Sequence, residues 1–107
     1  MNQQYCVVLT TVNNPDVQQA IIDELLKNQL AACIQAVPIQ SHYVWQDEVC
    51  ADQETLLIIK TRPTCYQQLE QLIVRLHNYD TPQVLQLPVS DGFDPYLQWL
   101  KLNTRCQ

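Results

Sequence analysis

The sequence predicts a single α+β domain in which two helices cover one face of a four-stranded antiparallel sheet, followed by a short third helix. Three observations carry this prediction. The chain has 107 residues, which is room for one domain spanning residues 1–107. Apolar, β-branched segments and amphipathic segments follow each other in the order strand, helix, strand, strand, helix, strand. The hydrophobic content of 47% is enough for a modest core, so a disordered chain is not expected.

The first half of the chain supplies the first strand, helix and second strand. Residues 5–11 are apolar and β-branched, as strands are. Asn14 caps a helix over residues 15–28, whose first position is a proline and whose apolar side chains recur every four residues. Residues 32–43 form an extended segment, and Pro38 within it predicts an edge strand or a bulge, because proline has no N–H to give to a neighbouring strand.

A turn near residues 46–48 reverses the chain, and residues 54–61 form the other arm of one long hairpin. Pro63 ends this strand. Residues 64–67 read T-x-x-Q, which matches the capping-box pattern at a helix start. Apolar positions spaced i, i+3, i+4 and i+7 then predict a second helix that ends by Asn78.

The last third of the chain closes the sheet. Residues 84–89 alternate apolar and polar side chains and form the fourth strand, and Asp94 with Pro95 begins the short third helix. Right-handed crossovers place the two main helices on the same face of the sheet, which is the ferredoxin-like arrangement.

Two of the strands predict self-association. Residues 6–9 and 56–59 are apolar on both faces, although the helices can cover only one. Each aliphatic side chain left in water forgoes about 1.5–3 kcal/mol of burial. We therefore expect the open face to pack against copies of the same chain; the alternative is that a loop or the third helix folds over it.

Composition excludes several classes of function. The net charge is −5 and no cluster of Lys or Arg exists, which argues against binding of nucleic acid or an anionic membrane surface. Gly92 is the single glycine, so neither a P-loop nor a dinucleotide fingerprint can be written. No constellation supports an enzyme. Residues 1–5 are polar and no segment could span a membrane, so a cytoplasmic protein is expected.

The five cysteines follow no zinc-ligand or C-x-x-C spacing. In a cytoplasmic protein they are expected to be reduced thiols, some of which serve as small buried apolar residues.

Four segments carry family-like motifs: Q-L-A-A-C-I at residues 29–34, Y-V-W at 43–45 with L-I-I-K-T at 57–61, H-N-Y-D-T-P at 77–82, and L-P-V at 87–89 with the later Gly, Tyr and Trp. Together they resemble the CutA family of divalent-cation tolerance proteins. The resemblance implies a ferredoxin-like homotrimer with its sheets facing inward, related in architecture to PII-type signalling proteins. It also implies a link to copper and other divalent metals.

The resemblance also implies sites. An intersubunit cleft would hold Lys60, Tyr79, Tyr96 and Trp99, and Cys33 and Glu54 are assigned to the same cleft. Aromatic rings beside a few polar groups are typical of small-molecule sites and equally of interfaces. Exposed aromatic residues near the hairpin tip, Trp45 with Tyr43, are expected to anchor the interface.

The metal site that the resemblance implies is altered in this chain. His77 remains as the candidate metal ligand, but the family's thiol position reads Thr10 and its glutamate position reads Gln83. A hydroxyl and an amide bind Cu(II) or Zn(II) poorly beside a thiolate and a carboxylate, so only weak binding of Cu(II) or another divalent cation is expected. Four carboxylates near the hairpin tip add electrostatic attraction for cations; they are Asp47, Glu48, Asp52 and Glu54.

The sequence thus predicts a homotrimeric binding protein for divalent metal tolerance that is not an enzyme. The alternative is a PII-like sensor that binds a small anionic metabolite in the clefts between subunits.

Overall fold

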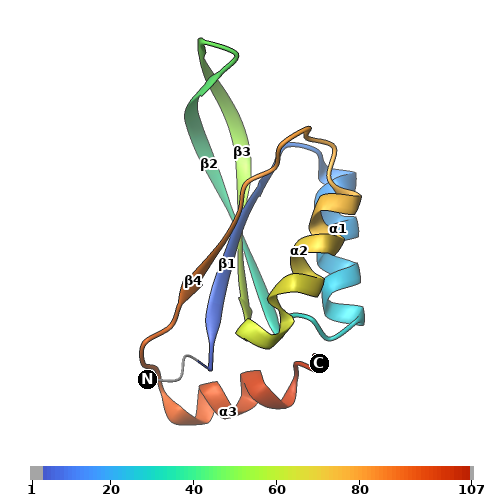
Figure 1. The fold of residues 1–107 in the computed structure, drawn as a ribbon, viewed down its shortest axis with the longest axis vertical. Coiled ribbons are helices and arrows are strands. Elements are labelled where there is room, and N and C mark those ends of the chain that lie inside the picture. Colours follow the sequence, from blue (N-terminus) through green and yellow to red (C-terminus); the bar gives the residue numbers. More distant parts are fainter. Residues whose placement is uncertain (1–3, 107) are drawn as a thin grey trace.

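The computed structural model describes residues 4–106, and within that range it confirms the predicted order of elements (Figure 1). The elements are β1 (Cys6–Val12), α1 (Pro15–Lys27), β2 (Cys33–Trp45), β3 (Glu48–Thr61), the 3-10 turn η1 (Pro63–Cys65), α2 (Tyr66–Leu76), β4 (Val84–Pro88) and α3 (Asp94–Leu102). None of the helices in residues 4–106 is long and apolar enough to cross a membrane.

The four strands form one antiparallel sheet in the order β2-β3-β1-β4. β2 is an edge strand, which agrees with the position predicted for Pro38. α1 and α2 lie side by side over one face of the sheet, and α3 lies across one end of it (Figure 1). This is the predicted ferredoxin-like arrangement, and it leaves the second face of the sheet without a covering helix.

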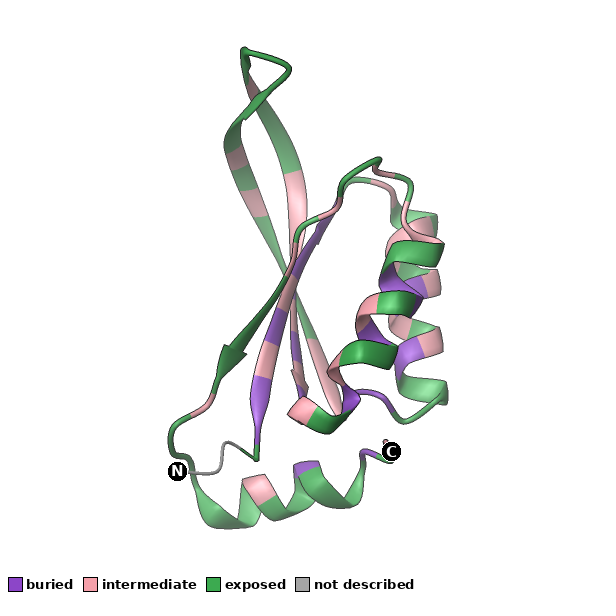
Figure 2. Cartoon of the chain, in the orientation of Figure 1, coloured by how far each residue is buried: buried purple, intermediate pink, exposed green. Residues whose placement is uncertain are grey.

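The core lies between the sheet and the helix pair. Alternate side chains of the central strands point toward the helices, so Val8, Leu57 and Ile59 are completely buried. The helices contribute the apolar stripe that their sequence periodicity predicts, and buried residues lie on the side of the helices that faces the sheet (Figure 2). The largest helix residues of this core are Ile21, Leu25, Leu69 and Ile73.

The start of α1 forms as predicted. The Asn14 side-chain oxygen accepts hydrogen bonds from the backbone N–H groups of Asp16 (2.9 Å) and Val17 (3.2 Å). These contacts satisfy two donors that a helix start leaves unpaired.

The predicted capping box at the start of α2 is wrong. Cys65 is the capping residue, and no side chain caps this helix. The reason is Pro63, which begins the 3-10 turn η1 one residue before Thr64. Thr64 therefore lies inside helical geometry instead of in the extended conformation that a capping side chain requires.

The hairpin of β2 and β3 is longer than predicted and extends beyond the rest of the molecule (Figure 1). β3 begins at Glu48 and not at residue 54, because hydrogen bonding between the two arms defines a strand here without burial. The turn has positive φ at both central residues, Gln46 (51°) and Asp47 (65°). Such turns match the right-handed twist of the two strands that they connect.

Cys65 and Cys106 form a disulfide, so the expectation of reduced thiols is wrong for this pair. Their Cα atoms lie 4.9 Å apart and 41 residues separate them in sequence. Closing a loop of this length stabilises the fold by roughly 4 kcal/mol in the chain-entropy model. The other cysteines, Cys6, Cys33 and Cys50, are free.

Replacing Asp47 with glycine is expected to raise the free energy of unfolding by about 0.5 kcal/mol, because glycine adopts positive φ without a steric cost. The neighbouring change Glu48→Gly falls in regular strand and is expected to lower it by about 0.5–1 kcal/mol. Urea unfolding of both variants measures the two values. Equal effects of the two substitutions would contradict the assigned turn.

Candidate functional site

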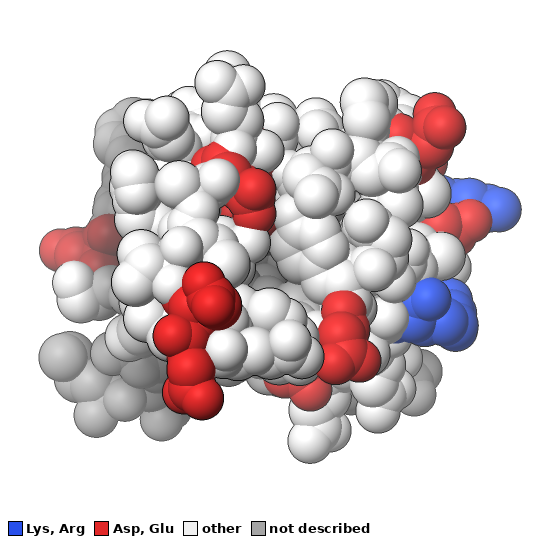
Figure 3. Space-filling model, turned by 90° about the horizontal axis from the view of Figure 1, so that it is seen from above, with Lys and Arg blue, Asp and Glu red and all other residues white. Residues whose placement is uncertain are grey.

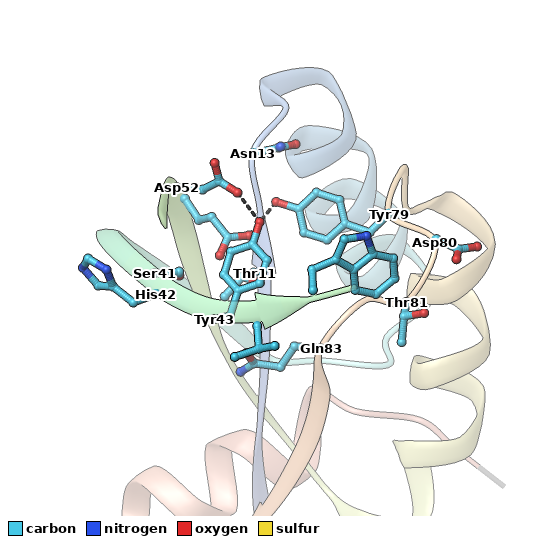
Figure 4. A pocket seen from close by; sticks show the side chains of 13 residues that line it. Thr11, Asn13, Ser41, His42, Tyr43, Asp52, Tyr79, Asp80, Thr81 and Gln83 are labelled. Atoms are coloured by element: carbon cyan, nitrogen blue, oxygen red, sulfur yellow. Dashed lines mark hydrogen bonds between the residues drawn. The ribbon is translucent and has the colours of Figure 1, made fainter. Parts of the chain in front are cut away.

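A pocket of about 740 Å³ lies between the hairpin and the loop after α2, at the end of the molecule where the hairpin protrudes (Figure 4). It is lined by residues from β1, the loop between β1 and α1, β2, β3 and the loop between α2 and β4. They are Thr11, Asn13, Ser41, His42, Tyr43, Val44, Trp45, Asp52, Glu54, Tyr79, Asp80, Thr81 and Gln83.

Two tyrosine–carboxylate pairs organise the pocket. The Tyr79 hydroxyl donates to Glu54 Oε2 at 2.5 Å, and the Tyr43 hydroxyl donates to Asp52 Oδ2. Burial and the bond to Glu54 raise the pKa of Tyr79. The bond to Asp52, with a smaller effect of burial, raises the pKa of Tyr43 to about 12. Both phenols therefore stay protonated at neutral pH and donate to carboxylates that remain acceptors.

His77 holds the loop that carries Tyr79. α2 ends just before His77, whose Nε2 lies 2.8 Å from the Thr11 carbonyl oxygen. Its Nδ1 accepts a hydrogen bond from the Tyr79 N–H at 3.1 Å, and the two rings pack with centroids 4.4 Å apart. This bonding pattern places the proton on Nε2. His77 thus ties β1 to the loop and positions Tyr79 against Glu54.

The pocket is acidic. Asp52, Glu54 and Asp80 are among its lining residues, and no described Lys or Arg lines it. Figure 3, which looks down on the hairpin end, shows acidic side chains spread over this end of the molecule, with Lys and Arg only at one side. Such a lining attracts cations and repels anions.

The remaining predicted cleft residues lie at the other end of the sheet. Lys60 Nζ donates to Gln35 Oε1 at 2.8 Å, and it pairs in register with Cys33 across β2 and β3. The rings of Tyr96 and Trp99 stack with centroids 5.6 Å apart. Within one chain, therefore, Tyr79 and Glu54 are separated from the other members of the predicted cleft. Lys60 and Glu54 do not pair within one chain: Lys60 donates to Gln35, and Glu54 accepts from Tyr79.

Tyr96 connects α3 to this second group. Its hydroxyl lies beside the Cys33 thiol, and burial, with a smaller effect of that thiol, raises the pKa of Tyr96. The predicted interface residues Tyr43 and Trp45 are 41% and 43% exposed, so both rings are available to a partner surface.

The residues at the family's metal positions do not converge. Thr10 is fully buried, and its hydroxyl is the one buried side-chain polar atom without a hydrogen-bond partner among residues 4–106. His77 uses both ring nitrogens in the contacts described above, so neither is free for a metal in this arrangement. In the described part of the chain, no group of three or more His, Cys, Asp or Glu side chains is placed to hold a metal ion.

Sequence reasoning missed Thr11, Asn13 and Asp80 as members of the pocket, and placed Asp52 only in an acidic hairpin tip. The register of the hairpin is the signal that could have placed Asp52, because Ser41 pairs with Asp52 and the diagonal neighbour is Tyr43. The loop residues carry no such signal, since nothing local fixes where a loop lies.

Comparisons with known proteins identify the family of this chain. Residues 6–103 match the model of the family described as CutA1 divalent ion tolerance protein. The chain is 41% identical over 99 residues to the divalent-cation tolerance protein CutA of Thermus thermophilus, covering 92% of this chain and 96% of that protein. It is 42% identical over 100 residues to the chloroplastic protein CutA of Arabidopsis thaliana, covering 92% of this chain. It spans only 55% of that plant protein.

Solved structures give the same result. The Thermus thermophilus divalent cation tolerance protein superposes with a TM-score of 0.90 at 40% identity, covering 94% of this chain and 99% of that one. CutA1 from Oryza sativa superposes with a TM-score of 0.90 at 40% identity, covering 95% of this chain and 94% of that one. The periplasmic divalent cation tolerance protein CutA from Archaeoglobus fulgidus superposes with a TM-score of 0.89 at 26% identity. The match covers 92% of this chain and 97% of that one. On the family match and these relatives, the chain belongs to the CutA1 divalent ion tolerance family.

Proposed function

We propose that this protein acts in divalent-cation tolerance as a homotrimer that binds a divalent cation, Cu(II) among them, weakly in its acidic pocket. The observation that carries the proposal is the pocket itself, which brings three carboxylates and two hydrogen-bonded phenols together without a described Lys or Arg. Relatives named for divalent-cation tolerance support the same role.

The uncovered sheet face supports self-association. Eight aliphatic side chains share this face by register, and Val37, Leu85 and Leu87 remain 40%, 53% and 45% exposed in the single chain. The eight are Val7, Leu9, Val37, Ile39, Leu56, Ile58, Leu85 and Leu87. α3 lies across the end of the sheet and not over this face (Figure 1). A contiguous apolar surface of this kind is a typical protein interface.

Inward-facing sheets in a trimer would bring the two ends of different copies together. Tyr79 and Glu54 of one copy could then meet Lys60, Cys33, Tyr96 and Trp99 of another, which is the predicted cleft. Tyr43 and Trp45 would anchor that contact.

Weak binding follows from the ligand chemistry. The pocket offers mainly carboxylate, phenol and hydroxyl oxygens, and these donors are not gathered at one point. Divalent cations that enter such a site keep much of their hydration shell. His77 acts as a positioning residue here and not as the metal ligand, because both of its nitrogens are occupied.

The role proposed is binding and not catalysis, because the pocket combines no nucleophile with an activating base. We propose a cytoplasmic location, in which thiols such as Cys6, Cys33 and Cys50 stay free. The Cys65–Cys106 disulfide is the observation that speaks against it.

A PII-like sensor of a small anion is the second candidate. Lys60 favours it, since its ammonium is bonded to the neutral Gln35 amide and its charge stays available to a ligand. The acidic pocket disfavours it, and an anion would have to bind at the Lys60 end of the sheet.

Light scattering at micromolar concentration is expected to give three times the chain mass of 12.4 kDa. Leu87→Lys is expected to lower this value toward one chain mass, because it puts a charge on the open sheet face. Val74→Lys serves as the control, since Val74 is 52% exposed on α2, which covers the opposite face of the sheet. A single-chain mass for the unmodified protein, or an equal effect of both variants, would refute the trimer.

Calorimetric titration with Cu(II), and with Mn(II) because the donors are mainly oxygens, is expected to show weak saturable binding. The double variant Asp52→Asn with Glu54→Gln is expected to weaken it by about tenfold or more, since it removes two charges beside the ion. Asp23→Asn removes an exposed charge on α1 and should leave binding unchanged.

No binding heat with either metal would overturn the cation proposal. Equal binding by the unmodified protein, the double variant and Asp23→Asn would overturn it too. Titration with inorganic phosphate decides the second candidate. Saturable phosphate binding that Lys60→Gln abolishes would favour the anion sensor instead.

A further inference from the structure

The three carboxylates of the acidic pocket are spread over two chain segments. Asp52 and Glu54 stand two residues apart on β3, which separates them by roughly 6.5 Å along the strand. Asp80 lies on the loop after α2, on the opposite side of the Tyr79 ring from Asp52 (Figure 4). No three His, Cys, Asp or Glu side chains within residues 4–106 are placed to hold one metal ion. A ligand that contacts all three carboxylates therefore has to spread its positive charge over several positions.

Both carboxylates of β3 keep hydrogen-bonding capacity for a ligand. Glu54 accepts from the Tyr79 hydroxyl, and Asp52 accepts from the Tyr43 hydroxyl. An ionised carboxylate can accept about four hydrogen bonds, so one phenol donor leaves most of this capacity unused. A primary or secondary ammonium group supplies N–H donors for these positions, whereas a quaternary ammonium group has none. The two carboxylates are therefore suited to protonated amines.

Apolar side chains make up much of the remaining lining. The rings of Tyr43, Trp45 and Tyr79 line the same pocket as the carboxylates, and Val44 adds an aliphatic surface. Aromatic faces attract organic cations and also pack against methylene groups. The pocket volume of about 740 Å³ falls within the range of about 300–1,000 Å³ that is common for small organic ligands. The lining therefore fits a cation with a hydrocarbon chain better than it fits a compact metal ion.

We propose that the acidic pocket binds an aliphatic polyamine, whose ammonium groups contact the separated carboxylates while its methylene chain packs on the aromatic rings. The inference deepens the cation-binding role proposed above and rests on the same carboxylates, although it requires no metal ion. It accounts for a feature that metal binding leaves unexplained, which is the presence of three aromatic rings in an acidic pocket.

The trimer proposed above is compatible with this ligand. Lys60 of a second copy would approach Tyr79 and Glu54, but one ammonium group against three carboxylates leaves the cleft negative. Tyr96 and Trp99 of that copy, whose rings stack with centroids 5.6 Å apart, would add aromatic surface to the same cleft. Assembly would thus keep the charge that attracts a polyamine and enlarge the surface that packs against its chain.

Calorimetric titration of the unmodified protein with two cations of equal charge tests the proposal. Spermidine carries its charges along a methylene chain, whereas hexaamminecobalt(III) is compact and has no hydrocarbon. Spermidine is expected to bind at least about tenfold more tightly, because only its charges can reach the separated carboxylates and only its chain can pack on the rings. The double variant Asp52→Asn with Glu54→Gln is expected to lose most of the spermidine binding.

The aromatic contribution is tested by Trp45→Ala, which is expected to weaken spermidine binding by about fivefold. Phe93→Ala is the matched control, because Phe93 is 74% exposed just before α3 and does not line the pocket. Light scattering checks that both variants keep the mass of the unmodified protein. If Trp45→Ala changes that mass, the comparison of the two cations on the unmodified protein decides the question.

Three results would contradict the proposal. The first is the absence of binding heat with spermidine, and the second is equal affinity for the two cations, which would mean that charge alone drives binding. The third is spermidine binding by Lys60→Gln but not by the unmodified protein, which would show that the lysine of a second copy occupies the pocket.

The metal and polyamine proposals can fail separately. Spermidine binding without binding of Cu(II) or Mn(II) would support the polyamine proposal and remove the metal one. Metal binding without spermidine binding would do the reverse.

Discussion

The structure depends on one mismatch: the sheet is apolar on both faces, and the helix pair covers only one of them. β1 and β3 carry aliphatic side chains on both faces, while α1 and α2 can cover only one of them. The covered face forms the core, in which residues such as Val8 and Ile59 are completely buried. The uncovered face is apolar as well, and the hydrophobic effect acts on it with the same strength per unit area. The trimer proposed above would remove this second face from water.

The acidic pocket is built on this framework by contacts that cross between elements. β3 supplies Glu54, the loop after α2 supplies Tyr79, and the His77 imidazole holds that loop to the Thr11 carbonyl. The phenols keep the carboxylates in place without neutralising them. The pocket thus retains its negative charge while its geometry is fixed, a combination suited to attracting cations from solution.

Most of the fold could be predicted from local signals in the sequence, whereas the site could not. The Asn14 cap and the spacing of Leu69, Leu72 and Ile73 have local physical causes, and the structure confirms them. The T-x-x-Q pattern misled because Pro63 moved the start of helical geometry by one residue. The Cys65–Cys106 pair and the contact of Tyr79 with Glu54 join residues far apart in sequence, and their proximity is a product of tertiary packing.

The pairing of β4 with β1 has a consequence for biosynthesis. Cys6 in β1 pairs with Pro88 in β4, so one edge of β1 finds its neighbour only after β4, the last strand of the sheet, has left the ribosome. Until then the nascent chain presents an unsatisfied strand edge beside exposed aliphatic residues, which is a hazard for aggregation on the polysome. Chaperones that shield nascent β-structure, or a slow approach to the final register, would matter more for this protein than its small size suggests.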